Sequence, residues 1–168
     1  MNKLLVSACL LGDPVRYDGR SKPLHHSGLA DLIAQDRVIG FCPEVGGGLP
    51  IPRKAAEIQM GDGAAVIAGQ AKVVTRDGSD VTRYFLSGAN QALALCRQHD
   101  IRIAVLTESS PSCGSGSIYD GSFSRHAIPA SGVTAALLKQ HGIRVFSQHQ
   151  LGEALNQLQT QGDEQPSR

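Results

Sequence analysis

The segment Ile101-Arg102-Ile103-Ala104-Val105-Leu106 is almost entirely apolar and is the clearest indication of the fold class. A strand of a parallel sheet is covered by helices on both faces, so its apolar residues occupy consecutive positions. Upstream, the segment 81–99 has apolar side chains at helical spacing and predicts a long helix capped by Asp80. A helix followed by a buried strand is the repeating unit of α/β folds.

Similar patterns alternate along the rest of the chain. Short apolar runs predict strands, at residues 3–8, 38–41 and 143–146. Amphipathic spacing predicts helices, at residues 27–33, 133–141 and 151–158. This order predicts a Rossmann-like three-layer α/β sandwich with a parallel sheet. We expect a single domain over residues 1–159 and a disordered polar tail over residues 160–168.

One part of the chain departs from this alternation. Short apolar segments predict additional strands, at residues 58–60, 64–67 and 72–75. Gly61-Asp62-Gly63 between the first two is typical of a hairpin turn. We therefore expect a small β insertion on the main domain. The segment 42–52, rich in proline and glycine, predicts no regular element.

The composition argues against several classes of function. The 168 residues carry a formal net charge of +1, and only 4% are aromatic. Because the basic residues are dispersed, we expect neither nucleic acid nor a membrane as a partner. The first apolar run is too short for the core of a signal peptide, and no segment is long enough to span a bilayer. We expect a cytoplasmic protein, in which cysteines serve metals or catalysis more often than disulfides.

Three of the four cysteines follow predicted strands, and they are Cys9, Cys42 and Cys113. Open α/β sheets bind ligands at the carboxyl edge, so these thiols share one site if their strands are neighbours. None of them has a second cysteine two to four residues away, which excludes zinc-finger and Cys-x-x-Cys arrangements. Cys96 lies on the apolar face of the long predicted helix, and we interpret it as core packing.

Three thiolates suit either zinc with an external fourth ligand or an iron–sulfur cluster in which one iron lacks a cysteine. The segments 46–48 and 114–116, which contain five glycines, are expected to bring backbone N–H groups to the sulfides of such a cluster. Two other interpretations stay open. One is a non-catalytic iron–sulfur or metal-binding protein, and the other is a metal-free enzyme with Cys113 as its nucleophile.

Polar side chains beside the cysteines are candidates for proton transfer and substrate contact. Glu44 lies two residues beyond Cys42 and is a candidate proton carrier. The loop before Cys113 supplies hydroxyl groups, from Ser109, Ser110 and Ser112. Serines in such loops also form turns and caps, so their residue type alone does not decide between the two roles.

Short motifs around these residues match a known family in combination. They are Ser7-Ala8-Cys9-Leu10-Leu11-Gly12, Arg16-Tyr17-Asp18-Gly19, Cys42-Pro43-Glu44-Val45, Pro50-Ile51-Pro52-Arg53 and Ser110-Pro111-Ser112-Cys113-Gly114. With these motifs the chain resembles, over residues 2–158, the bacterial thiouracil desulfurase (TudS) family, formerly a domain of unknown function.

The resemblance implies a [4Fe–4S] cluster held by only three cysteines, which match Cys9, Cys42 and Cys113. It implies removal of sulfur from 2-thiouracil or a related thiolated pyrimidine, giving uracil and hydrogen sulfide without net redox change. An acidic residue that matches Glu44 and a serine best matched by Ser110 are implied to handle protons and position the substrate. We assign substrate contact to the neighbouring hydroxyls, those of Ser109 and Ser112.

Overall fold

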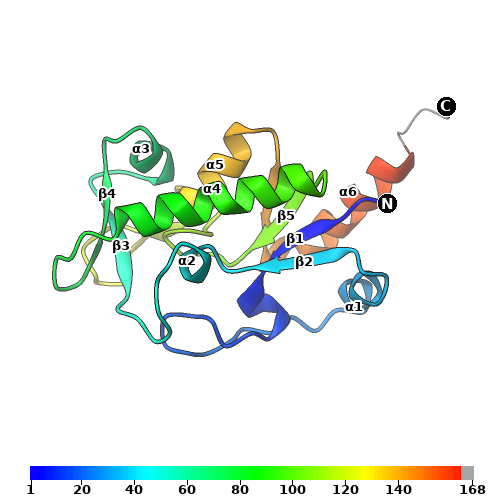
Figure 1. Cartoon of the computed structure of the whole chain (residues 1–168), viewed down its shortest axis with the longest axis horizontal. Coiled ribbons are helices and arrows are strands. Elements are labelled where there is room, and N and C mark those ends of the chain that lie inside the picture. Colours follow the sequence, from blue (N-terminus) through cyan, green and yellow to red (C-terminus); the bar gives the residue numbers. More distant parts are fainter. Residues whose placement is uncertain (164–168) are drawn as a thin grey trace.

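The computed structural model describes residues 1–163 and is built around a wholly parallel, four-stranded sheet (Figure 1). Its strands are β1 (Leu4–Ser7), β2 (Val38–Phe41), β5 (Ile103–Leu106) and β8 (Arg144–Ser147). Their spatial order is β2-β1-β5-β8. The strands that precede the three cysteines are therefore neighbours, as a shared site requires.

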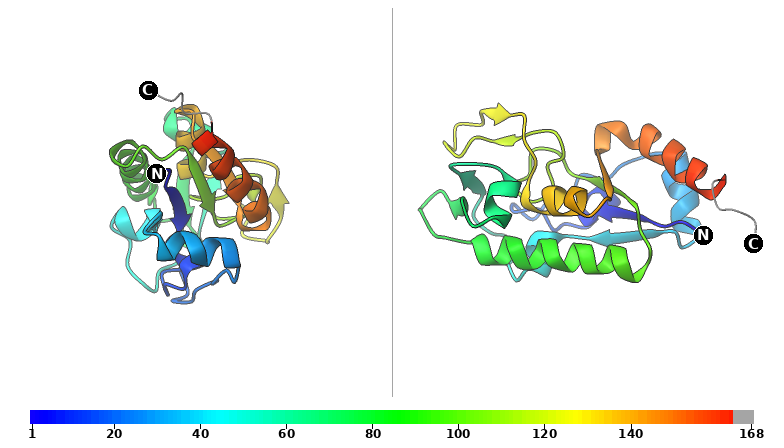
Figure 2. Two further views of the ribbon diagram at one scale, coloured as in Figure 1. Left: turned by 90° about the vertical axis from the view of Figure 1, so that its right-hand side faces the viewer. Right: turned by 90° about the horizontal axis from the view of Figure 1, so that it is seen from above.

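Helices cover both faces of this sheet and complete three layers (Figure 2). They are α1 (Ser27–Ala34) and α6 (Leu151–Asp163) on one face, and α4 (Thr82–Gln98) and α5 (Val133–Gln140) on the other. Successive strand residues point to opposite faces. Leu4 accordingly packs in one buried cluster with Leu29 of α1, and Leu5 packs in another with Phe85 of α4. The predicted three-layer α/β sandwich is confirmed.

The chain connections create a switch point between β1 and β5. The connection from β1 to β2 runs through α1 on one face, and the connection from β2 to β5 runs through α4 on the opposite face. Open α/β sheets bind ligands in the crevice at the carboxyl ends of the strands at such a point. Cys9 follows β1 in the short 3-10 helix η1 (Ala8–Leu11), and Cys113 follows β5.

The insertion between β2 and β5 differs from the predicted one. Its strands β3 (Ala56–Gln59) and β4 (Lys72–Thr75) form an antiparallel pair, but residues 64–67 belong to the helix α3 (Gly63–Ile67). Oδ1 of Asp62 accepts a hydrogen bond of 2.9 Å from the backbone N–H of Ala65 and caps this helix. The predicted strand over 64–67 and the Gly-Asp-Gly hairpin are therefore wrong.

Two further elements near the carboxyl edge were not predicted. The segment after Cys42 begins with one helical turn, α2 (Pro43–Gly46), where proline occupies a favoured position at the helix start. This turn packs on α4 at Gly88, where a Cβ atom would collide with the backbone of Pro43. The strands β6 (Ile118–Tyr119) and β7 (Ala127–Ile128) form a second antiparallel pair.

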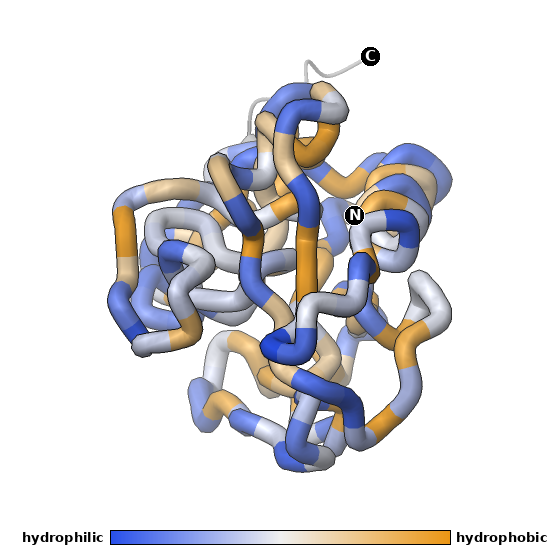
Figure 3. Tube along the Cα trace, turned by 90° about the vertical axis from the view of Figure 1, so that its left-hand side faces the viewer, coloured by the Kyte–Doolittle hydropathy of each residue, from blue (hydrophilic) through white to orange (hydrophobic). Residues whose placement is uncertain are grey.

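The insertion and the β6–β7 pair extend the molecule beyond the carboxyl edge of the sheet, on the left in Figure 1. Figure 3 looks at this end and shows largely hydrophilic loops around hydrophobic segments. Helix α6 follows β8 and η2 (Gln148–Gln150) and runs to Asp163, so residues 160–163, predicted to be disordered, are helical. The rest of the predicted tail, 164–168, lies outside the described residues.

Helix α4 is the longest helix in the part of the chain that the structure describes. Neither it nor any other helix there combines the length and the apolar composition needed to cross a membrane.

Candidate active site

The thiols of Cys9, Cys42 and Cys113 line one cavity of about 410 Å³ at the carboxyl edge of the sheet. Strands β1 and β2 end in register, with Ser7 opposite Phe41, so Cys9 and Cys42 both lie just beyond the edge. Cys113 reaches the same cavity from the loop after β5. The structure therefore brings together three side chains that are up to 104 positions apart in the sequence (113 − 9).

All four cysteines are free thiols, and Cys96 differs from the other three in its surroundings. It lies in α4 within the buried apolar cluster and does not line the cavity. Burial raises the pKa of the Cys96 thiol to about 11, so it stays protonated at neutral pH. This environment agrees with the predicted role of Cys96 in core packing.

Two of the three thiols in the cavity are buried, Cys42 is half-buried, and the three act on one another. Cys9 is 8% exposed and Cys113 is 5% exposed. Burial raises the pKa of the Cys113 thiol, a hydrogen bond with the Ser7 hydroxyl opposes this rise, and the negative charges of Cys42, Glu44 and Cys9 add to it. Burial also raises the pKa of the Cys42 thiol, and the backbone N–H group of Val45 partly opposes this rise. Positive charge brought into the cavity would favour all three thiolates.

The donor set fits a cluster better than a single ion. A tetrahedral zinc ion needs thiolates about 3.8 Å apart. Within the part of the chain that the structure describes, no three His, Cys, Asp or Glu side chains are arranged to hold one metal ion. The three thiols instead line a cavity of about 410 Å³, and sulfur ligands suit iron–sulfur clusters.

The glycine amides do not face the cavity as predicted. The N–H group of Gly47 donates to the carbonyl of Pro43 at 2.9 Å, and that of Gly114 donates to the carbonyl of Ser110 at 2.9 Å. The N–H group of Gly116 donates to the carboxylate of Glu108 at 3.1 Å. These amides stabilise α2 and the Cys113 loop, so the expectation that they serve cluster sulfides is wrong.

Glu44 lines the cavity from α2 and is paired with a buried arginine. Nε of Arg53 lies 3.4 Å from Oε1 of Glu44, and the Arg53 side chain is only 5% exposed. Nη1 of the same guanidinium donates to the carbonyl of Pro50 at 3.3 Å. Sequence reasoning assigned no role to Arg53, although it lies in one of the family motifs. The only available signal was a charged residue directly after the segment Pro50-Ile51-Pro52.

The three serines before Cys113 have different surroundings. Oγ of Ser110 accepts hydrogen bonds of 3.1 Å from the N–H groups of Ser112 and Cys113, which leaves its own hydrogen free to be donated. Ser109 has a positive φ of 66°, lines the cavity with Ser110, and lies 3.2 Å from the Ser117 hydroxyl. Ser112 is fully buried and bonds Thr134 at 2.8 Å. The structure thus does not bring Ser112 to the cavity, against its predicted substrate contact.

Glu108 organises the loop that carries Cys113, a role that sequence reasoning missed. Its Oε1 accepts hydrogen bonds of 3.0–3.3 Å from backbone N–H groups, those of Ser109, Ser115, Gly116 and Ser117. Burial tends to raise the pKa of Glu108, but these donors together lower it below its usual value. An ionised Glu108 therefore fixes the path of the loop on both sides of Cys113.

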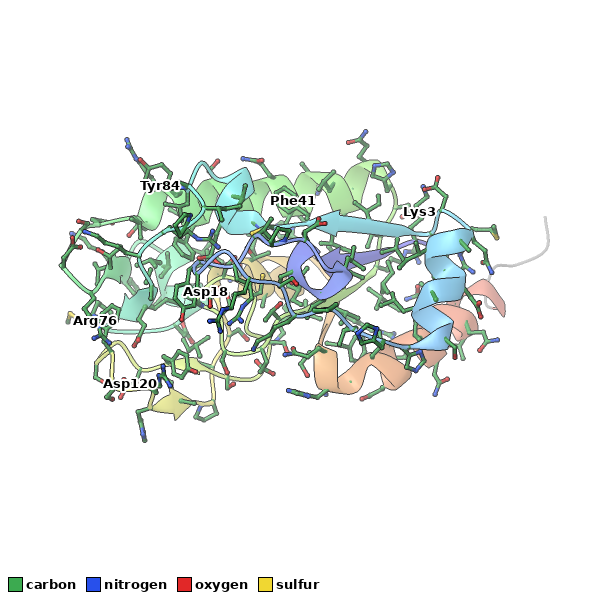
Figure 4. The ribbon with its side chains drawn as sticks, turned by 90° about the horizontal axis from the view of Figure 1, so that it is seen from below. Lys3, Asp18, Phe41, Arg76, Tyr84 and Asp120 are labelled. Atoms are coloured by element: carbon green, nitrogen blue, oxygen red, sulfur yellow. The ribbon has the colours of Figure 1, made fainter. Side chains whose placement is uncertain are left out.

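The outer wall of the cavity comes from the insertion and the β6–β7 segment. Oε1 of Glu57 in β3 accepts hydrogen bonds from the N–H groups of Gly121, at 2.9 Å, and Phe123, at 3.2 Å. Arg76, which also lines the cavity, donates to the carbonyl of Phe123 at 3.0 Å. Figure 4 shows Arg76 and Asp120 at this end of the molecule, opposite Lys3. The wall depends on contacts between distant segments.

Known proteins are similar to this chain over most of its length. The profile of the family described as 2-thiouracil desulfurase matches residues 4–150. An uncharacterized protein, YbbK of Bacillus subtilis (strain 168), is 44% identical over 152 residues, which are 90% of this chain and 99% of YbbK. A solved structure named [4Fe–4S]-dependent thiouracil desulfidase TudS is 49% identical, with a TM-score of 0.87. The match covers 95% of this chain and 99% of that one.

Proposed function

This chain belongs to the 2-thiouracil desulfurase family, and we propose that it hydrolyses the C–S bond of 2-thiouracil or a related thiolated pyrimidine. One water is consumed for each sulfide released, so 2-thiouracil gives uracil and hydrogen sulfide without net redox change. The observation that carries the proposal is the shared cavity, which holds three thiols, Glu44 and Ser110 at the switch point of the sheet.

The proposed cofactor is a [4Fe–4S] cluster held by Cys9, Cys42 and Cys113. The named dependence of the solved relative on such a cluster supports this, as does the set of three sulfur donors around one cavity. When bound, a cluster with three protein ligands supplies an iron that acts as a Lewis acid toward the sulfur of the substrate.

Glu44 is proposed to exchange protons with the substrate and the attacking water. The Arg53 guanidinium binds its Oε1 and limits the orientations of the carboxyl group. Cys42 is the N-cap of α2, and Glu44 lies two residues later in the same helical turn. The carboxyl group is therefore held close to a proposed cluster ligand. A positioned carboxyl group in a shielded cavity is a suitable general acid or base.

Ser110 is proposed to donate a hydrogen bond to the pyrimidine. Both lone pairs of its oxygen accept backbone N–H groups, so its hydroxyl hydrogen is the group left for a substrate oxygen or nitrogen. Ser109 adds a second hydroxyl on the same wall of the cavity. Ser112 is not included, because its hydroxyl bonds Thr134 in the protein interior.

The cytoplasm is the proposed location. Four free thiols and an oxygen-sensitive type of cofactor suit a reducing compartment. We propose a thiolated pyrimidine as the small-molecule substrate, on the same grounds as the reaction, namely the family and the shared cavity.

Product analysis tests this function against its alternatives. We expect the anaerobically purified, cluster-loaded protein to convert 2-thiouracil into equal amounts of uracil and sulfide with no reductant added. A loaded protein that releases no sulfide would indicate a non-catalytic iron–sulfur protein. Equal activity in protein freed of iron would favour the metal-free nucleophile.

A further inference from the structure

Two hydroxyl side chains at the switch point lie directly behind the thiols. Oγ1 of Thr107, the residue after β5, lies 2.9 Å from Sγ of Cys9. The backbone N–H group of the same threonine donates to Oγ of Ser7, the last residue of β1, at 3.0 Å. Ser7 is 2% exposed and Thr107 is 7% exposed, so water does not compete for these bonds.

The directions of these hydrogen bonds follow from the chemistry of the groups. The oxygen of Ser7 accepts the N–H group of Thr107, which leaves the hydroxyl hydrogen of Ser7 free to be donated into the cavity that Ser7 and Cys113 both line. A thiolate has no hydrogen to donate, so Thr107 must be the donor once Cys9 is ionised. The sulfur of Cys9 thus has a buried hydroxyl donor at 2.9 Å, and Ser7 offers a second buried hydroxyl on the wall that it shares with Cys113.

We propose that Thr107 and Ser7 are positioning residues that donate O–H···S hydrogen bonds to the ligand sulfurs of Cys9 and Cys113. This inference rests on the proposed function, because it takes the two thiolates as cluster ligands. The donors withdraw electron density from the sulfurs, and hydrogen bonds to ligand sulfurs are one determinant of cluster potential.

Cys42 lacks this arrangement and differs from its partners. Its Sγ faces the carbonyl oxygen of Val15 at 3.9 Å, and a carbonyl oxygen accepts hydrogen bonds but donates none. Only the donors at Cys9 and Cys113 are removable by substitution of a side chain.

The test uses substitutions that remove a hydroxyl and keep the shape. We would prepare Thr107→Val and Ser7→Ala as cluster-loaded, anaerobic proteins, with Thr107→Ser to restore the hydroxyl. Thr134→Val is the matched control, because Thr134 is also fully buried but bonds Ser112 instead of a thiol. The readouts are iron per chain and the reduction potential from a spectroscopic titration.

We expect Thr107→Val and Ser7→Ala to bind as much iron as the parent but to have more negative potentials, since the charged reduced state loses a donor. Thr107→Ser and Thr134→Val should match the parent. Unchanged potentials in both loaded variants would overturn the proposal. If Thr107→Val folds poorly, Ser7→Ala tests the same claim at the other ligand. A parent protein that binds no cluster would instead contradict the proposed function, so the two failures are distinguishable.

Discussion

Nε of Arg53 lies 3.4 Å from Oε1 of Glu44, and the two side chains are only 5% and 18% exposed. An ion pair so far removed from water depends strongly on both members, because the loss of one leaves the other charge buried without a partner. The pair connects the loop after α2 to the proposed proton carrier. It also joins the loop at residues 15–17 to the site, since the N–H group of Arg53 donates to the carbonyl of Tyr17 at 2.8 Å.

The substitution Glu44→Gln keeps the shape of the side chain and removes its ability to carry a proton. We expect cluster absorbance close to that of the parent and a fall in sulfide release of about 100-fold or more. Glu153→Gln on α6 is the matched control, because Glu153 is exposed. Turnover of Glu44→Gln at the parent rate would show that Glu44 is not the proton carrier.

The substitution Arg53→Gln removes the charge that faces Glu44. We expect kcat to fall about 10-fold, because the Glu44 carboxyl group loses the partner that orients it. The free energy of unfolding should fall by about 3 kcal/mol, since a buried carboxylate loses its partner. Arg53→Lys should recover part of kcat, because it keeps the charge without the planar group. Arg102→Gln is the control, as its side chain is 68% exposed. Kinetics and urea unfolding measure both effects, and an unchanged kcat would argue against a role for the pair.

Ser110 and Ser112 form a matched pair within one loop. We expect Ser110→Ala to lower sulfide release by about 10-fold or more, because a donor to the substrate is lost. Ser112→Ala should leave kcat unchanged and lower the free energy of unfolding by about 1–2 kcal/mol, because the Thr134 hydroxyl loses its buried partner. The opposite pattern in kinetics would move the role from Ser110 to Ser112.

Much of the fold was predictable because buried parallel strands have a distinct composition. The apolar runs that form β1, β2 and β5 are each followed by a cysteine. Because these parallel strands are neighbours in the sheet, the three cysteines lie at one edge. The run at 64–67 was ambiguous, because four apolar residues fit a strand or a buried helical turn equally well. The capping hydrogen bond that Asp62 accepts from the N–H group of Ala65 decides between them in the folded chain.

The candidate site was less predictable than the fold. The cavity position of Glu44 follows from its closeness to Cys42, but its partner Arg53 becomes buried only through contacts made by the folded loop. Similarly, the directions of Ser109, Ser110 and Ser112 depend on local backbone angles, including the positive φ of Ser109. Hydroxyl spacing alone does not specify these angles.

The lowered pKa of Glu108 predicts that its contribution to the free energy of unfolding depends on pH. Burial tends to raise the pKa of Glu108, but its backbone N–H partners lower it below the ordinary value of 4.5. Since the folded pKa lies below the unfolded one, the ionised carboxyl group stabilises the fold above pH 4.5. This contribution is lost as the pH falls through the folded pKa.

We therefore expect Glu108→Gln to lower the free energy of unfolding by about 2 kcal/mol at neutral pH. The difference from the parent should shrink as the pH falls below 4.5. Urea unfolding at several pH values measures it, with Glu153→Gln as the exposed control. A difference that stays constant down to acid pH would contradict the role of the ionised carboxylate.

The central claim is that three thiols, and not the fourth, hold an iron–sulfur cluster. The most direct measurement is iron and acid-labile sulfide per chain in anaerobically reconstituted protein with single Cys→Ala substitutions at positions 9, 42, 96 and 113. We predict about four iron and four sulfide for the parent and for Cys96→Ala, and a large loss for the other three variants. Full iron content in Cys9→Ala, Cys42→Ala and Cys113→Ala, or its loss in Cys96→Ala alone, would contradict the claim.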